Sequence, residues 1–254
     1  MPWLLLLAFL AGLWVEGPES APETAVGVVF HDANKNHKRD AGESGLKGIR
    51  VSNGREITVT NAKGAWRLPA PEQGEFFVIK PRGWMTPISP QGTPHYYYVH
   101  RPDGSRKSKY AGSSPTGKLP DSINFPLIKQ KESDDLRVLM YGDPQPRNRR
   151  EIQWMKKDVV KECKGFDGSF GMALGDITFN DLSLFEEVAS TLHEVGIPWW
   201  MVVGNHDINF DAPEDQLSNE TFIAAFGPPN YSFDWGPAHF LVLDDVQWIL
   251  PESG

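Results

Sequence analysis

The 254-residue sequence contains a single cysteine, Cys163. No disulfide can form within the chain, so its fold must be held by a hydrophobic core or by bound metal, whichever compartment it occupies. Basic residues are also few: 25 Lys and Arg stand against 33 Asp and Glu, which gives a formal net charge of −8. Nucleic acids and anionic membrane surfaces bind clustered Lys and Arg, so this balance argues against both as partners. A small or neutral substrate remains open.

Long apolar runs are missing as well. The apolar stretch from Leu4 to Val15 is too short to span a bilayer and has about the length of a signal-peptide hydrophobic region. We therefore expect residues 1–21 to be an export signal and the protein to be periplasmic, displayed on the cell surface or secreted, with no integral membrane span. An N-terminal core element or a lipid-facing anchor is the alternative, and the cleavage point is open.

Residues 24–128 are predicted to form a small antiparallel β-sandwich with a Pro- and Gly-rich tail. Short alternating runs, separated by Gly, Asn and Pro, are typical of strands, and no stretch has convincing helical periodicity. The five runs are Val26–Phe30, Gly48–Val51, Glu56–Thr60, Ala65–Leu68 and Glu75–Lys80. Tyr96-Tyr-Tyr98, in the tail, is expected to pack between domains. The charged stretch Lys129–Asp135 is expected to be a solvated linker.

One loop of the predicted sandwich has the oxygen pattern of a calcium site. Five side chains fall at positions one, three, five, nine and twelve of an EF-hand-type loop: Asp32, Asn34, Asn36, Asp40 and Glu43. His37 stands at position six, where the sharp turn favours Gly, so it must adopt a positive φ or reshape the loop. A polar surface turn has a similar composition. Calcium binding and an ordinary turn therefore both remain open.

Residues 136–254 repeat one arrangement three times, in which an apolar run ends in a glycine followed by polar side chains. The polar segments begin at Asp143, Asp176 and Asn205, so the spacings are 33 and 29 residues, with room for one crossover helix each. Helices are expected near Asn148–Glu162, Ser183–Gly196 and Thr221–Phe226. Parallel strands present their carboxyl ends at one edge of a sheet, where such sheets bind ligands. The three turns should therefore converge.

These turns also carry a family resemblance. Gly142-Asp-Pro-Gln145, Gly175-Asp176 and Gly204-Asn-His-Asp207, in this order and spacing, resemble the first three motifs of the calcineurin-like metallophosphoesterases. Gly27–Asn36, with Gly45–Gly48 and Val51–Gly54, resembles the prealbumin-like domains that precede some secreted members of that family and recur in bacterial adhesins. The implied fold is a small all-β sandwich followed by an α/β domain of the αββα type.

The resemblance implies a metal-dependent hydrolase of phosphoester bonds. Two divalent ions (Mn, Fe, Zn or Mg) would clamp a small phosphoester substrate, and a hydroxide bound between them would attack it. The implied metal ligands are Asp143, Gln145, Asp176 and Asn205, with Asp176 shared by both ions. His206 would be the catalytic histidine, and Asp207 would orient its imidazole ring.

Two departures from the family pattern bear on activity. Gln145 stands where many members have a metal-binding histidine, and an amide oxygen favours hard ions over Fe and Zn. The later family motifs, a lone His and then Gly-His-x-His, do not occur; after Asp207 the only histidine is His239. We therefore expect the chain to be incomplete at its C-terminus as a phosphoesterase domain, and inactive alone.

The alternative function is an exported binding or structural module with a degenerate, non-catalytic phosphoesterase domain. A Gly-His-x-His segment encoded beyond codon 254 would discriminate between the two. The natural substrate, the choice of monoester or diester, the native metal and the oligomeric state stay open.

Overall fold

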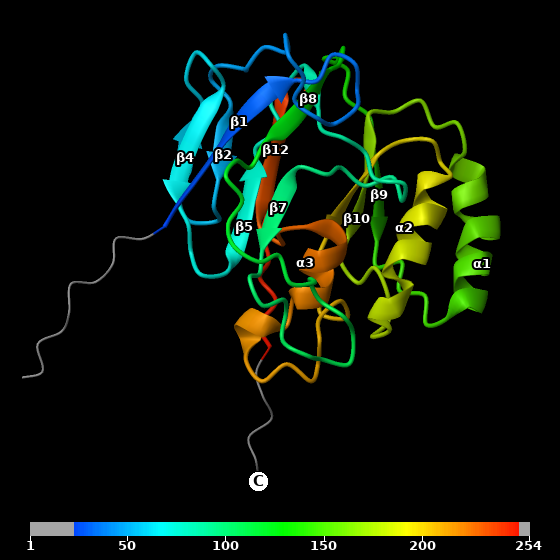
Figure 1. Ribbon diagram of the computed structural model, residues 1–254. Coiled ribbons are helices and arrows are strands. Elements are labelled where there is room, and N and C mark those ends of the chain that lie inside the picture. The colour runs from blue at the N-terminus through cyan, green and yellow to red at the C-terminus, as the bar shows by residue number, and fades with distance from the viewer. Residues whose placement is uncertain (1–22, 249–254) are drawn as a thin grey trace, which may run out of the picture.

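Strands dominate residues 23–248, the part of the chain that the computed structural model describes (Figure 1). The expected export signal at residues 1–21 lies outside these residues. Within them, no helix combines the length and the apolar composition needed to cross a membrane. The strands are β1 (Thr24–His31), β2 (Arg50–Ser52), β3 (Ile57–Val59), β4 (Ala65–Pro69), β5 (Gly74–Val78), β6 (Trp84–Met85), β7 (Tyr97–His100), β8 (Phe125–Lys129), β9 (Val138–Gly142), β10 (Phe170–Leu174), β11 (Trp199–Val202), β12 (Tyr231–Trp235) and β13 (Ala238–Val242). The helices are α1 (Arg149–Asp158), α2 (Phe185–His193) and α3 (Glu220–Phe226), with 3₁₀ turns η1 (Val160–Cys163), η2 (Leu182–Leu184) and η3 (Asp215–Leu217).

The N-terminal part consists of two four-stranded sheets, with strand orders β4-β1-β8-β6 and β3-β2-β5-β7. Their inner faces meet through aromatic rings: Trp66 lies 6.0 Å from Phe76 of the other sheet and 5.8 Å from Phe125. The expected purely antiparallel arrangement was wrong, because β1 pairs with β8 in parallel. β6, β7 and β8 come from the stretch that the sequence pattern left as a Pro- and Gly-rich tail.

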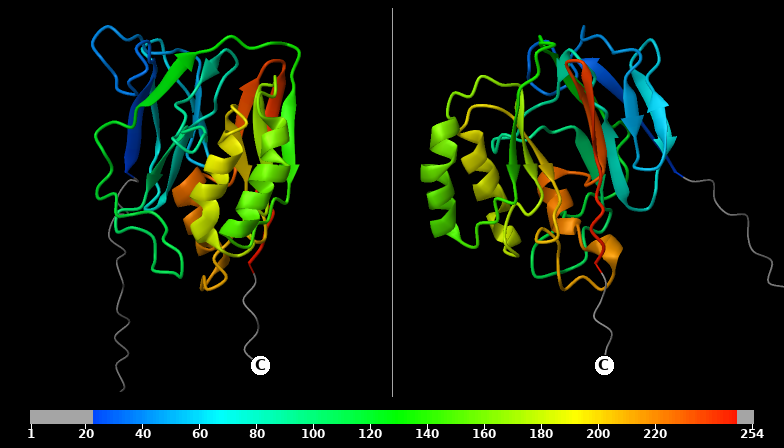
Figure 2. Two further views of the ribbon diagram at one scale, coloured as in Figure 1. Left: turned by 90° about the vertical axis from the view of Figure 1, so that its right-hand side faces the viewer. Right: turned by 180° about the vertical axis from the view of Figure 1, so that it is seen from behind.

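The parallel sheet β11-β10-β9 follows, with α1 and α2 on one of its faces (Figure 2). Side chains alternate between the two faces, as a strand requires: Trp199 and Met201 contact the helical side, whereas Trp200 faces the opposite side. α1 begins where its cap was expected, because the side chain of Asn148 accepts a hydrogen bond from the backbone N–H of Glu151.

An aromatic core joins this sheet to the N-terminal sheets through the hairpin β12–β13. The rings of Trp200 and Phe233 stack at 3.9 Å, and Tyr96 lies 5.3 Å from Trp200 and 5.2 Å from Tyr231. Tyr96 is buried, which confirms the expected packing role of the tyrosine segment. Within residues 23–248, β-sheet rather than helix covers the far side of the hairpin, so the αββα layering was not found. The regions 24–128 and 136–248 share one continuous core.

A buried ion pair strengthens this junction. Lys80 is fully buried, and its Nζ donates to Glu132 Oε1 at 2.7 Å and to the backbone oxygen of Asp234 at 2.6 Å. Burial lowers the pKa of Lys80, against the opposing effect of Glu132. The segment Lys129–Asp135 was expected to be a solvated linker, but the side chain of Glu132 is only 1% exposed because it supplies the counter-charge for Lys80.

Candidate functional site

The three polar turns leave the same edge of the parallel sheet. Leu174 at the end of β10 is in register with Gly142 of β9 and Val202 of β11. The chain therefore emerges from three adjacent strand ends into Asp143, Asp176 and Asn205. This arrangement is the one predicted from the spacing of the motifs, and it follows from parallel pairing alone.

The backbone of these turns is strained at several non-glycine residues. Asp143, Gln145, Asp176 and Asn180 have φ values of 46°, 38°, 47° and 61°. Such left-handed conformations cost on the order of 1–3 kcal/mol each and cluster at functional sites. Four of the six non-glycine residues with positive φ in the described chain belong to this one edge of the sheet.

Asp176 connects the three turns. Its Oδ1 accepts the backbone N–H of His206 at 2.9 Å, and its Oδ2 accepts the side-chain amide of Gln145. The backbone oxygen of Asp176 also accepts the N–H of Gln145 at 3.0 Å. Gly204 is required beside it, since a Cβ there would lie 2.1 Å from the Asp176 nitrogen. Asp176 is thus the central carboxylate of the edge and is only 6% exposed.

His206 is oriented by residues of the second turn. Its Nδ1 lies 2.6 Å from Asn180 Oδ1, and its ring stacks on Phe179 at a centroid distance of 4.4 Å. The guanidinium of Arg147 lies 4.9 Å from the centroid of the same Phe179 ring. An amide oxygen can only accept, so Nδ1 carries the proton, and Nε2 has no hydrogen-bond partner within residues 23–248. The sequence motifs did not predict Asn180, whose left-handed backbone, with φ 61°, depends on how the second turn packs.

Asp207 differs from its expected role of orienting His206. It is fully buried, and its oxygens accept three backbone N–H groups, from Ile177 at 2.9 Å, Thr178 at 3.1 Å and Gly204 at 3.0 Å. These bonds tie the second turn to the third. Burial raises the pKa of Asp207 to about 7, the three N–H donors oppose that shift, and the charge of Asp176 adds to it. Asn180 occupies the orienting position instead.

The remaining expected ligands, Asp143 and Asn205, are exposed at the strand ends, and no side-chain hydrogen bond engages either within residues 23–248. Over the same residues, no group of three or more His, Cys, Asp or Glu side chains is placed to hold a metal ion. The available donors are two carboxylates and two amides. Such a set fits a hard divalent ion such as Mg²⁺ or Mn²⁺, and it lacks the imidazoles that Fe and Zn favour.

His239 and Asp244 follow the motif turns in the sequence, but neither joins this set. His239 Nδ1 lies 2.6 Å from Asp234 Oδ1. Asp244 accepts the side-chain amide of Asn219 at 2.6 Å, and burial raises its pKa. Each side chain therefore has a local structural partner of its own.

The candidate calcium loop has the backbone that its sequence required. His37 adopts φ 64°, the positive value that a non-glycine residue at position six must accept. Asp32 is buried and accepts the backbone N–H groups of Asn36 and His37 at 3.2 and 2.9 Å. Asp40 Oδ2 accepts the side-chain amides of Asn34 and Asn36, and Glu43 accepts two further backbone N–H groups. The five predicted side chains thus belong to one hydrogen-bonded loop.

Comparison with known proteins bears mainly on the N-terminal sheets. Residues 33–111 match the family described as N terminal of Calcineurin-like phosphoesterase. The matched stretch lies wholly before the three motif turns, so it and the motifs are separate resemblances to one family. No curated protein matches the chain.

Two solved structures show limited similarity. A mutant of the shaft pilin SpaA from Lactobacillus rhamnosus GG is 10% identical, with a TM-score of 0.28; the match covers 52% of this chain and 58% of the pilin chain. The purple acid phosphatase PPD1 from yellow lupin is 12% identical, with a TM-score of 0.31, covering 76% of this chain and 38% of the phosphatase. The chain thus spans little more than half of the pilin chain and well under half of the phosphatase. TM-scores this low do not establish a shared fold with either protein.

Proposed function

We propose that this chain supplies the first metal ligands and the catalytic histidine of an exported, metal-dependent hydrolase of phosphoester bonds. The observation that carries the proposal is the convergence of Asp143, Asp176 and Asn205 at one edge of a parallel sheet, with His206 tied to the central carboxylate. The family match over residues 33–111 agrees with this assignment.

Asp143, Gln145, Asp176 and Asn205 would hold the metal ions. Divalent ions bound there would supply positive charge against a phosphoryl group and lower the pKa of a water molecule. The protein's own contribution is positional. Asn180 holds the His206 ring with Nε2 free, so that this nitrogen can contact a phosphoryl oxygen or the leaving oxygen. Because Asp176 is hydrogen-bonded from two turns, its geometry does not depend on a single flexible side chain.

The decisive experiment compares the 254-residue chain with a protein extended through any Gly-His-x-His segment that follows it in the gene. We expect the extended protein to release nitrophenol from nitrophenyl phosphate mono- or diesters only with added Mn²⁺, and Asp176→Asn to abolish that release. The 254-residue chain, with four donors, should bind Mn²⁺ weakly in calorimetric titration and hydrolyse no ester above background. Turnover that survives both a chelator and Asp176→Asn would refute the proposal.

The competing proposal is a non-catalytic binding or structural module. The absence of a three-membered acidic or imidazole cluster among residues 23–248 favours it. An extended protein that binds Mn²⁺ tightly but turns over no ester would establish it. Tight binding of two ions by the 254-residue chain would instead show that the ligands have been misassigned.

For the loop from Asp32 to Glu43 we propose calcium binding. The positive φ of His37 supports this proposal, because the strained turn is the one that an EF-hand-type loop requires at position six. Calcium would replace the amide and backbone donors that now approach Asp40 and Glu43.

A further inference from the structure

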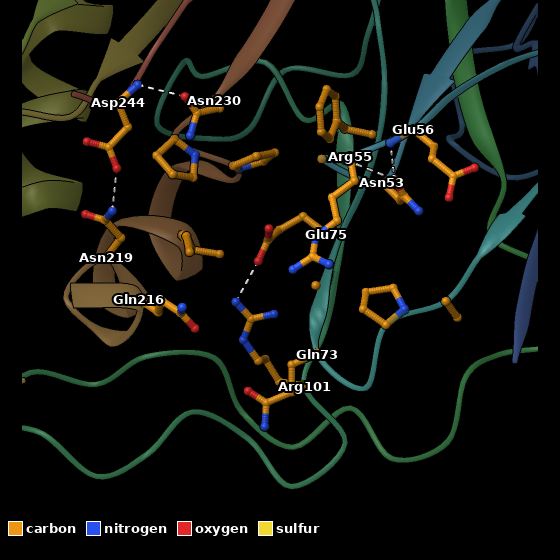
Figure 3. A pocket seen from close by; sticks show the side chains of 18 of the residues that line it. Asn53, Arg55, Glu56, Gln73, Glu75, Arg101, Gln216, Asn219, Asn230 and Asp244 are labelled. Atoms are coloured by element: carbon orange, nitrogen blue, oxygen red, sulfur yellow. Dashed lines mark hydrogen bonds and ion pairs between the residues drawn. The ribbon is translucent and has the colours of Figure 1, made fainter. Parts of the chain in front are cut away.

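A hollow of about 640 Å³, which we call the junction cleft, lies where the N-terminal sheets meet the region around α3 (Figure 3). The β2–β3 and β4–β5 turns form one wall, and η3, α3 and the loop before β12 form the other. None of the residues assigned above to the phosphoester site lines it. Its volume falls within the range of small-molecule sites, roughly 300–1,000 Å³, and such sites favour domain junctions.

The charged groups deep in the junction cleft are already matched. Arg101, whose side chain is only 6% exposed, donates to Glu75 Oε1 at 2.6 Å and to Glu220 Oε1 at 2.8 Å. Figure 3 shows Glu75 reaching across the pocket toward Arg101. Since two carboxylates surround this guanidinium, it offers little attraction to an anion. The second oxygen of Glu75 accepts no hydrogen bond from residues 23–248 and remains available to a ligand.

The walls are rich in side-chain amides, which both donate and accept hydrogen bonds. Five amides line the cleft: Asn53, Gln73, Gln216, Asn219 and Asn230. Asn53, Asn219 and Asn230 already hydrogen-bond to neighbouring groups. Within residues 23–248, the side chains of Gln73 and Gln216 make no hydrogen bond and can serve a ligand. The other charged residues of the lining are Arg55 and Glu56 on the β2–β3 turn and Asp215 and Asp244 on the facing side, so carboxylates outnumber the one further cation. An anionic ligand would meet these three carboxylates. Hydroxyl groups can donate to the carboxylates and can both donate to and accept from the amides.

Apolar surface completes the lining. Pro71 and Pro229 are half-buried on opposite walls, and the buried Ile223 also belongs to the lining. These residues present rigid C–H surfaces beside the amides. We propose that the junction cleft binds a neutral oligosaccharide, with its hydroxyl groups on Gln73, Gln216 and the free Glu75 oxygen and its C–H faces against the prolines. This site is independent of the phosphoester chemistry proposed above.

The test uses the whole chain and three neutral trisaccharides: cellotriose, maltotriose and tri-N-acetylchitotriose. Saturation-transfer NMR and calorimetric titration are run with each, and with inorganic phosphate and spermidine as charged probes. We expect at least one trisaccharide to bind with a Kd of about 1 mM or tighter. Gln216→Ala should weaken it about fivefold, the effect of one lost hydrogen bond. Gln216 is exposed, so its truncation leaves the fold intact.

Gln153→Ala, the same change at an exposed position on α1, is the matched control and should leave binding unaltered. If none of the three sugars binds, or if binding is equal in the Gln216→Ala and control proteins, the proposal is wrong. Saturable binding of phosphate alone, lost in Arg55→Ala, would identify an anion site instead. Binding of spermidine alone would identify a cation site and would equally overturn the proposal.

Discussion

The buried carboxyl group of Asp207 makes folding stability depend on pH in an unusual direction. Its pKa in the folded protein is raised to about 7, chiefly by burial, against an ordinary value of about 3.9 in the unfolded chain. Between those values the folded state holds a proton that the unfolded state has released. The free energy of unfolding therefore falls as pH rises through this window, by about 1.4 kcal/mol per pH unit and about 4 kcal/mol in all.

Asp207→Asn removes this titration and keeps the shape. The amide oxygen can still accept from Ile177 and Gly204, which share Oδ2, but its NH₂ group then faces the N–H of Thr178. One unpaired buried donor costs about 1–3 kcal/mol at every pH. We therefore expect the variant to be less stable than the wild type near pH 4, and to lose that disadvantage or reverse it near pH 8.

The measurement is urea denaturation between pH 4 and pH 8 in the presence of a chelator, which keeps adventitious metal away from the strand-end carboxylates. Asp103→Asn, an exposed aspartate in the loop after β7, serves as the matched control and should follow the wild-type curve. Parallel stability curves for wild type and Asp207→Asn would refute the reasoning, because they would show that Asp207 has the same charge in both states.

Three further predictions concern other parts of the molecule. Asn180→Ala should reduce the preference of His206 for the tautomer protonated at Nδ1 about fivefold, since one hydrogen bond of about 1 kcal/mol is lost. The ¹⁵N NMR shifts of the ring report the tautomer ratio, and an unchanged ratio would contradict the prediction. Calcium should raise the Tm of the whole chain, and Glu43→Gln should abolish that rise by removing the bidentate ligand; no shift in the wild type means an ordinary turn. Lys80→Met should destabilise the fold by about 3–5 kcal/mol, because it leaves Glu132 buried without its cation. Urea denaturation should show that adding Glu132→Gln recovers part of that lost stability. No recovery would assign the effect to packing alone.

The sequence was informative wherever structure is set by neighbours along the chain. Alternating apolar residues located β1 and β4, and the Asn148 cap located the start of α1. β7 and β8 were missed because their strand character comes from pairing with distant segments. The burial of Glu132 was missed for a related reason, since the cation that draws it inward lies 52 residues earlier.

The same distinction explains the outcome at the candidate site. Parallel pairing brings the three motif turns to one edge, and pairing could be inferred from the lengths of the intervening segments. Which polar side chain then reaches His206 depends on the left-handed backbone at Asn180 and on the depth to which Asp207 is buried. Both properties arise only after the turns have packed. Asp207, beside His206 in sequence, binds the backbone of the second turn, and Asn180, from that same turn, binds His206. Both contacts therefore join the second turn to the third. The orientation of the histidine depends on the packing of these two turns, which Asp207 stabilises.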